Sequence, residues 1–329
     1  MNCALAKAGE KFEGRNTGDQ IQVANPLAAI TGAGIALLSV FPAVALVGGA
    51  PEASHSIAQH VVMVVGSDKT YCSGVVIAQD LILTAAQCIH PATKYGIIGF
   101  DAPKTLKNVA STIVHPDWDV TAALRHKVSA DVALLKLAAR LPPAYMPVAL
   151  ADSQKVVTAG SQVTVAGYGQ AIAGALKTGG TLRAAHLLVT GNPGPLQIRL
   201  VDPNTKGELA GLGSCMGDSG GPVLDASDGQ LAVIGMMSWA TGPALSTGCG
   251  GLTGVTPIVR YRDWIIKTAA AMGSALSPMA PAEPSESSPS PSLNRANCDP
   301  LTWLGGQTSA NQRDEGCMER IASAVSCSA

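Results

Sequence analysis

The string CMGDSGGPV, Cys215 to Val223, places a serine inside a glycine-rich turn. Glycine lets the backbone fold tightly and approach a ligand closely, so the hydroxyl of Ser219 can reach a substrate carbonyl. The same tight backbone can direct N–H groups at the oxyanion that forms when a carbonyl is attacked. These residue types at this spacing predict nucleophilic attack on an acyl group.

Two upstream segments carry further groups for such a site. SADVALLKL, Ser129 to Leu137, is typical of a buried strand and has one acidic residue, Asp131, near its start. CSGVVIAQDLILTAAQC, Cys72 to Cys88, has Gln87 directly before its second cysteine. The candidate residues therefore occur along the chain in the order Gln87, Asp131 and Ser219.

The three segments, in this order, resemble the trypsin and chymotrypsin family of serine proteases over about Leu46 to Met272. The resemblance implies an all-β fold of two six-stranded antiparallel β-barrels with a C-terminal helix, and no cofactor. It implies Ser219 as the nucleophile and the backbone N–H groups of Gly217 and Ser219 as the oxyanion hole. It also implies that Asp131 orients and charge-stabilises an imidazole.

LVGGAPEA, Leu46 to Ala53, resembles the mature N-terminus of that family. There, a newly exposed α-amino group pairs with the aspartate just before the nucleophile, which is Asp218 in this chain. Burying a carboxylate without a cation is costly, so the resemblance implies that this pair keeps the oxyanion hole open.

The substrate pocket implied by the resemblance carries no charge, because the position six residues before Ser219 is Gly213. An Arg or Lys side chain would be buried there unpaired, so we expect an apolar side chain of medium size to enter. The residues implied to form the pocket are Gly213, Ser214, Ser238, Trp239, Ala240 and Gly254, and the implied disulfides are Cys72–Cys88 and Cys215–Cys249.

Gln87 occupies the position at which the family carries its catalytic histidine. A glutamine amide has no protonation equilibrium near neutral pH, so it can hydrogen-bond to Ser219 but cannot carry its proton. Losing one member of the triad costs about 10⁴- to 10⁶-fold in turnover. The amide can still donate to Asp131, which would keep the site polar and folded.

No other histidine has a motif that would place it at this site. His90 follows Gln87 by three residues and would lie about 4.5 Å further along a helical axis. The implied Cys72–Cys88 bridge would keep the segment in its usual register, which argues against that replacement. The remaining histidines are His55, His60, His115, His126 and His186.

Two functions fit this pattern. The first is a catalytically impaired pseudoprotease that acts by binding a protein or peptide. The second is an active serine endopeptidase that cleaves after small or medium apolar residues with unconventional base chemistry. A formal net charge of −1 does not indicate the basic surface that a nucleic-acid-binding protein needs.

Short strands must position these residues, because 36 glycines, 21 prolines and only 14% charged residues favour tight turns over long helices. YRDWIIKTAAAM, Tyr261 to Met272, predicts a closing helix with its apolar residues on one face. The strand-like runs before it are HVVMVV, YCSGVVIAQDLILTAA, VALLKL, SQVTVAGYG, LAVIGMMSW and GLTGVTPIV.

The first 45 residues predict a signal peptide, because the apolar run Pro26 to Ala45 ends in Ala43-Val44-Ala45. The alternative is an uncleaved spanning helix, the only case in which we expect membrane contact. Cleavage after Ala45 would itself release Leu46, so we expect export and maturation to be one event. The protein would then be secreted or periplasmic, where disulfides form.

Beyond the 46–272 domain, residues 273–296 form a Pro/Ser-rich linker and residues 297–329 a small tail with three cysteines. On a helix, Cys317 and Cys327 would lie about 15 Å apart, which is too far for a disulfide. We therefore expect Cys298 to pair with one of them. A third hypothesis is that the tail anchors the protein to a surface or partner, with the barrels as a scaffold.

Overall fold

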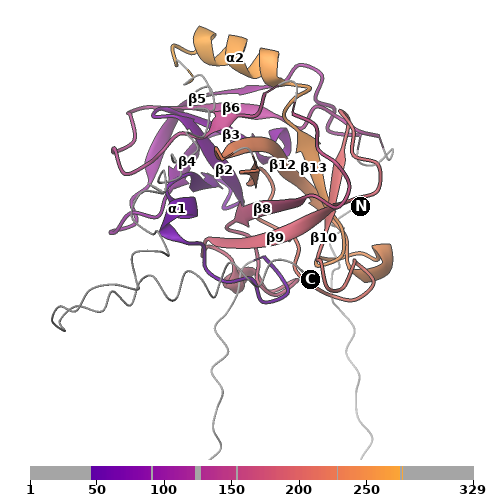
Figure 1. Cartoon of the computed structure of the whole chain (residues 1–329). Helices are drawn as coiled ribbons and strands as arrows, with labels where there is room; N and C mark the ends of the chain where they lie inside the picture. The colour runs from indigo at the N-terminus through magenta and orange to yellow at the C-terminus, as the bar shows by residue number, and fades with distance from the viewer. Residues whose placement is uncertain are drawn as a thin grey trace, which may run out of the picture. The chain divides into compact units, whose positions relative to one another are not determined.

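The short apolar runs form strands in the computed structural model, which describes residues 46–89, 92–122, 127–152, 155–227, 229–274 and 276 (Figure 1). The predicted signal segment, almost all of the predicted linker and the whole tail lie outside these residues. His90 and His126 lie outside them too.

The first half of the domain is a closed barrel of six antiparallel strands in the order β1-β2-β3-β6-β5-β4. A short helix, α1 (His55–Ala58), precedes it, and a 3₁₀ turn, η1 (Ala86–Ile89), follows β3. The strands are β1 (Val61–Gly66), β2 (Tyr71–Ala78), β3 (Leu81–Thr84), β4 (Tyr95–Ile98), β5 (Lys107–Val114) and β6 (Ala133–Leu137).

The second half is a sheet in the order β11-β8-β9-β10-β13-β12-β7, which the additional pairing of β11 with β12 closes. Six of its strands form the antiparallel barrel, and β7 joins β12 in parallel. The predicted pair of six-stranded barrels is therefore confirmed. The strands are β7 (Ala149–Leu150), β8 (Gln162–Gly167), β9 (Arg183–Thr190), β10 (Ile198–Val201), β11 (Pro222–Asp225), β12 (Ala232–Ala240) and β13 (Thr253–Pro257), with the 3₁₀ turns η3 (Leu176–Thr178) and η4 (Pro243–Leu245).

Burial along the strands shows where the cores lie. β3 is buried at all four positions, whereas β5 alternates between exposed and partly buried residues. A strand buried on both faces lies between two layers, and an alternating strand has one face in water. Each barrel has its own apolar cluster, and a third cluster joins residues of both barrels, including Leu83, Leu134 and Met236.

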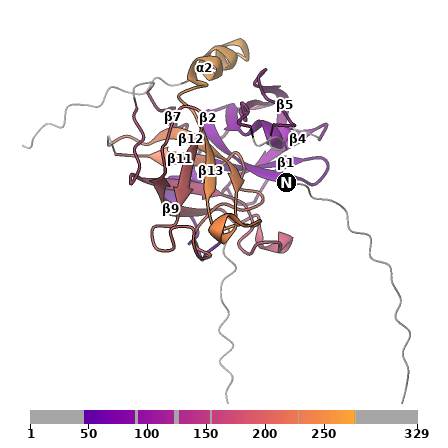
Figure 2. The ribbon, with the colours of Figure 1, turned by 90° about the vertical axis from the view of Figure 1, so that its right-hand side faces the viewer.

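The predicted C-terminal helix is confirmed as α2 (Arg262–Ala271), which lies at one end of the pair of barrels in both views (Figures 1 and 2). Its buried residues Ile265 and Ala269 join the cluster between the barrels. Just beyond the helix, Ser274 accepts a hydrogen bond from Lys136 Nζ at 2.6 Å and donates one to Asp80 at 2.7 Å. Within the described ranges, no helix is long and apolar enough to cross a membrane.

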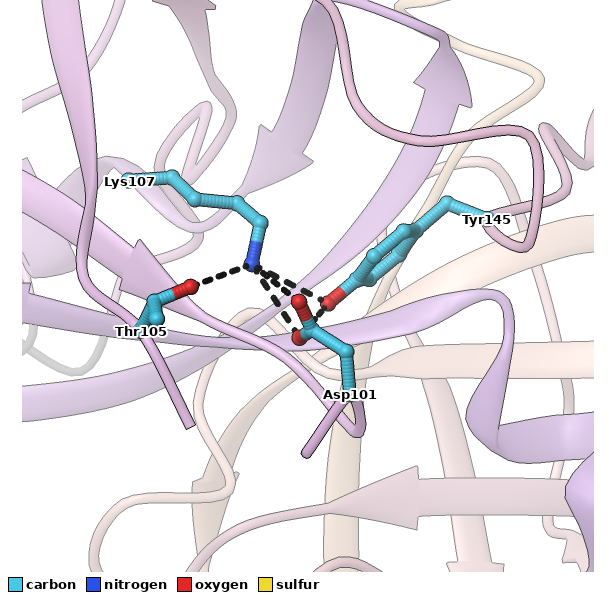
Figure 3. A network of polar contacts seen from close by, with 4 residues as sticks. All are labelled: Asp101, Thr105, Lys107 and Tyr145. Atoms are coloured by element: carbon cyan, nitrogen blue, oxygen red, sulfur yellow. Dashed lines mark hydrogen bonds and ion pairs between the residues drawn. The ribbon is translucent and has the colours of Figure 1, made fainter. Parts of the chain in front are cut away.

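A polar network connects the chain after β4 with Tyr145, which lies in the segment between β6 and β7 (Figure 3). Lys107 Nζ lies 2.8 Å from Asp101 Oδ2 and 3.4 Å from the Tyr145 hydroxyl, and that hydroxyl donates a short hydrogen bond to Asp101. Burial, together with the adjacent Asp101, raises the pKa of Tyr145, so the phenol stays protonated and keeps donating. The phenol also lies against Gly99, where a Cβ atom would collide with it.

We predict that Lys107→Met lowers the free energy of unfolding by about 1–2 kcal/mol, because Asp101 loses its cation in a partly buried position. Urea unfolding of the full chain at pH 7 measures this loss. Burial raises the pKa of Asp101, but the hydrogen bonds and the charge of Lys107 lower it more, so the carboxylate contributes stability only while it is ionised. The difference in unfolding free energy between Lys107→Met and the unmodified chain should therefore shrink as the pH falls below about 4.

The matched control is Lys104→Met, which changes an exposed lysine in the loop just before β5 and should shift stability by less than about 0.5 kcal/mol. Equal midpoints for the two variants would show that the network contributes nothing.

Candidate functional site

The sequence-predicted residues Gln87 and Asp131 meet where η1 follows β3 and the chain enters β6. The Gln87 backbone N–H donates to Asp131 Oδ1 at 2.9 Å, and the Gln87 side-chain Nε2 donates to Asp131 Oδ2 at 2.7 Å. The Ser238 hydroxyl donates to the same Oδ2 atom at 2.6 Å. Residues from both barrels therefore hold one carboxylate.

The orientation of the Gln87 amide follows from its neighbours. Nε2 also donates to the Ser238 carbonyl oxygen at 2.6 Å. Both acceptors lack hydrogens, so the NH₂ group must face them and both of its hydrogens are used. The side-chain carbonyl Oε1 then faces away from these acceptors, and it can accept hydrogen bonds but cannot take up a proton near neutral pH.

Asp131 is 7% exposed. Burial raises the pKa of its carboxyl group, and the hydrogen bonds from Ser238 and Gln87 act in the opposite direction. Without a donor at position 87, the carboxylate would be buried with fewer hydrogen bonds and no cation. The Gln87 amide therefore stabilises this part of the barrel junction.

Ser219 lies next to the same segment, in the turn before β11. Its carbonyl oxygen accepts a hydrogen bond from the Ser73 N–H at 2.9 Å and lies 3.5 Å from Cys88 Sγ. The side chain is partly exposed. Among the described residues, no acceptor is found for the backbone N–H groups of Gly217 and Ser219. Both donors are thus free to bind a ligand.

A buried serine that the sequence analysis did not single out holds this turn. Ser73, on β2, is fully buried, and its hydroxyl donates to the Gly217 carbonyl oxygen at 2.9 Å. The same hydroxyl accepts the Tyr168 N–H at 2.9 Å. Gly217 has a φ of 97°, a conformation that favours glycine. Ser73 thus orients the peptide group between Gly217 and Asp218.

Asp218, next to Ser219, is fully buried. It accepts hydrogen bonds from the backbone N–H groups of Gly169 and Cys215, each at 2.8 Å. Burial raises the pKa of Asp218 to about 7, since these two donors offset only part of the lost hydration.

The segment predicted to carry the mature N-terminus is docked in the second barrel. Leu46 is fully buried within that barrel's cluster, and Val47 forms a β-bridge with Gly213. Gly48, at a φ of 87°, lies so close to the Gly211 carbonyl that a Cβ atom would collide with it. The pairing of a Leu46 α-amino group with Asp218 stays a prediction.

The predicted pocket residues come together, with one difference. In the β12–β13 register, Trp239 faces Gly254 and Ala240 faces Thr253, after a shift between Met237 and Trp239. A Cβ atom on Gly254 would collide with the Trp239 indole, so Gly254 lies under that ring and does not form the pocket wall. Thr253 takes the position expected for Gly254.

Both implied disulfides, Cys72–Cys88 and Cys215–Cys249, are confirmed. The four described histidines make other contacts: His55 with the Phe100 ring, His60 with the Met146 carbonyl, His115 with two aromatic rings of the C-terminal segment, and His186 with Thr164. Across the described residues, no His, Cys, Asp and Glu side chains are grouped to hold a metal ion.

We predict that Asp218 makes the full chain, which still carries residues 1–45, less stable as the pH rises. Its folded pKa of about 7 exceeds its ordinary value of 3.8, so the folded state binds more protons. The free energy of unfolding should therefore fall between about pH 4 and pH 7, by about 4 kcal/mol. Urea unfolding at pH 5 and pH 8 should show about 3 kcal/mol of this fall, because part of it is complete by pH 5, and Asp218→Asn should remove it.

A chain that begins at Leu46 provides the comparison. If its α-amino group pairs with Asp218, Asp218→Asn should cost stability at pH 8 in that chain alone. The same response to Asp218→Asn in both chains would exclude the pairing.

Comparison with known proteins agrees with the fold. The chain matches the Trypsin family over residues 46–265, which include every strand of both barrels. It is 28% identical to kallikrein-8 of Homo sapiens over 214 residues, 61% of this chain and 78% of that protein. It is 25% identical to human kallikrein-11 over 209 residues, 60% of this chain and 71% of that protein. The chain therefore belongs to the trypsin family of serine proteases.

Proposed function

We propose that this protein is an exported, catalytically impaired member of the trypsin family that acts by binding a protein or peptide segment in its substrate cleft. One observation carries the proposal: the Gln87 amide donates both of its hydrogens to Asp131 and Ser238. A glutamine here thus takes the hydrogen-bonding place of an imidazole, without a proton equilibrium.

The consequence for catalysis concerns the Ser219 proton. In the triad mechanism a base takes this proton during attack and returns it to the leaving amine. The Oε1 atom of Gln87 can orient the Ser219 hydroxyl but cannot accept its proton. The attacking oxygen therefore stays protonated, and the acyl-transfer step lacks its base.

The groups that bind a peptide do not depend on that base. The N–H groups of Gly217 and Ser219 have no acceptor among the described residues, and Ser73 holds their turn from the first barrel. Such preorganised donors bind a peptide carbonyl oxygen whether or not it is attacked. These features support a cleft that recognises a segment without cutting it.

The alternative is an active serine endopeptidase with unconventional base chemistry. The nucleophile Ser219, partly exposed beside two open N–H donors, favours this second function. The two functions differ in one measurable property, which is Ser219-dependent turnover.

We predict that the otherwise unmodified chain that begins at Leu46 cleaves peptides no faster than its Ser219→Ala variant. Gln87→His should raise kcat/KM by about 10³-fold or more, because the Asp131 carboxylate already accepts a hydrogen bond from the side chain at position 87 and can accept a ring N–H in its place. Initial-rate kinetics on peptides with a small apolar residue before the scissile bond measures the effect.

The matched control is Gln87→Ala, which removes the amide without adding a base and should give no activity. Adding Ser219→Ala to Gln87→His should abolish the gain. Ser219-dependent cleavage by the unmodified chain would reject the impaired-enzyme proposal and establish the alternative.

A further inference from the structure

The wall of the substrate pocket carries a side chain where the sequence predicted only glycine. Paired residues of antiparallel strands project to the same face, and consecutive residues project to opposite faces. Trp239 and Gly254 therefore share one face of the β12–β13 ribbon, and Ala240 and Thr253 share the other.

The contacts of Thr253 identify its face as the inside of the pocket. Its Oγ1 atom lies 3.5 Å from the point that a Cβ atom on Gly213 would occupy. Gly213 is the residue expected at the pocket base, six positions before Ser219. Thr253 is fully buried, so its side chain occupies the interior between Gly213 and Ala240.

Two hydrogen bonds keep the Thr253 side chain in place. Its Oγ1 atom accepts the Ser214 N–H at 2.9 Å and the Ser214 hydroxyl at 3.1 Å. Ser214 belongs to the chain segment that carries Gly213, and the adjacent Cys215–Cys249 disulfide ties this segment to the loop before β13. A ligand would have to break both bonds to rotate the threonine out of the pocket.

We propose that the pocket accepts only a small side chain, such as that of alanine, serine or valine, and that Thr253 sets this limit. The inference rests on the proposed function, because it assumes that the cleft binds a peptide segment. Leucine, phenylalanine or arginine would need the volume that Thr253 fills. Arginine would also meet no carboxylate among the groups closest to Gly213, which are Gly250 and Thr253.

The test uses a small rigid serine-protease inhibitor whose exposed loop carries alanine, valine, leucine, phenylalanine or arginine at the residue that enters the pocket. Calorimetry with the unmodified full chain should give affinities for the alanine and valine loops at least tenfold higher than for the other three, a size typical of one misfitting side chain. Equal or tighter binding of the leucine, phenylalanine or arginine loop would overturn the proposal.

Two variants separate size from polarity. Thr253→Gly should raise the affinity for the leucine and phenylalanine loops at least tenfold. Thr253→Val keeps the shape and should keep the preference for small residues. Thr253→Ala, a smaller change, replaces Thr253→Gly if the glycine variant does not fold. An unchanged ranking in a folded Thr253→Gly or Thr253→Ala protein would exclude Thr253 as the limiting residue.

A second readout keeps this inference separate from the proposed function. If none of the loops binds the unmodified chain, the binding function fails. The Gln87→His variant is then assayed on five peptide substrates that carry alanine, valine, leucine, phenylalanine or arginine before the scissile bond. A kcat/KM ranking that favours alanine and valine would support the Thr253 limit, and a ranking that favours larger residues would overturn it.

Discussion

The Asp131 carboxylate lies where the two barrels meet, and its requirement for hydrogen-bond donors constrains the whole site. Both of its oxygens accept hydrogen bonds, from the Gln87 backbone, the Gln87 side chain and the Ser238 hydroxyl. These donors come from η1 in the first barrel and β12 in the second. A buried carboxylate that lost them would destabilise the junction that forms the cleft. Gln87 therefore meets a structural demand that exists whether or not the protein cleaves anything.

Asp218 is a second buried carboxylate, and it organises the opposite side of the cleft. It accepts the N–H of Cys215, in the chain just before Ser219, and the N–H of Gly169, just after β8, while Ser73 binds the turn from the first barrel. Ser73 thus ties the nucleophile turn to the first barrel, which also carries Gln87. Because side chains and backbone of both barrels take part, the cleft keeps its shape without an imidazole.

Much of this architecture could be predicted from the sequence. The β-branched runs mark β1, β2, β3, β6, β8, β12 and β13, and the resemblance of the motifs supplied both barrels and both disulfides. The hydrogen bond from Gln87 to Asp131 was also expected, since an amide is the only donor available at that position. Strands such as β9, RAAHLLVT, alternate buried residues with mostly half-buried ones and have shorter apolar runs, so they were not singled out.

The details that were missed depend on register and on distant contacts. The shift between Met237 and Trp239 exchanges the residues facing each side of β12 and β13, so Thr253 took the place expected for Gly254. No local pattern reveals such a shift. Ser73 resembles an ordinary strand residue, because its partners Gly217 and Tyr168 are 144 and 95 residues away in the sequence.

The contacts around Gln87 also bear on how readily this chain could change over evolutionary time. Glutamine and histidine codons differ only in their third base, so one nucleotide substitution separates the two residues. The Asp131 carboxylate and the Ser238 carbonyl already accept both hydrogens of the amide. A lineage carrying this gene therefore stands one mutational step from the histidine form, with the acceptors for the ring inherited in place.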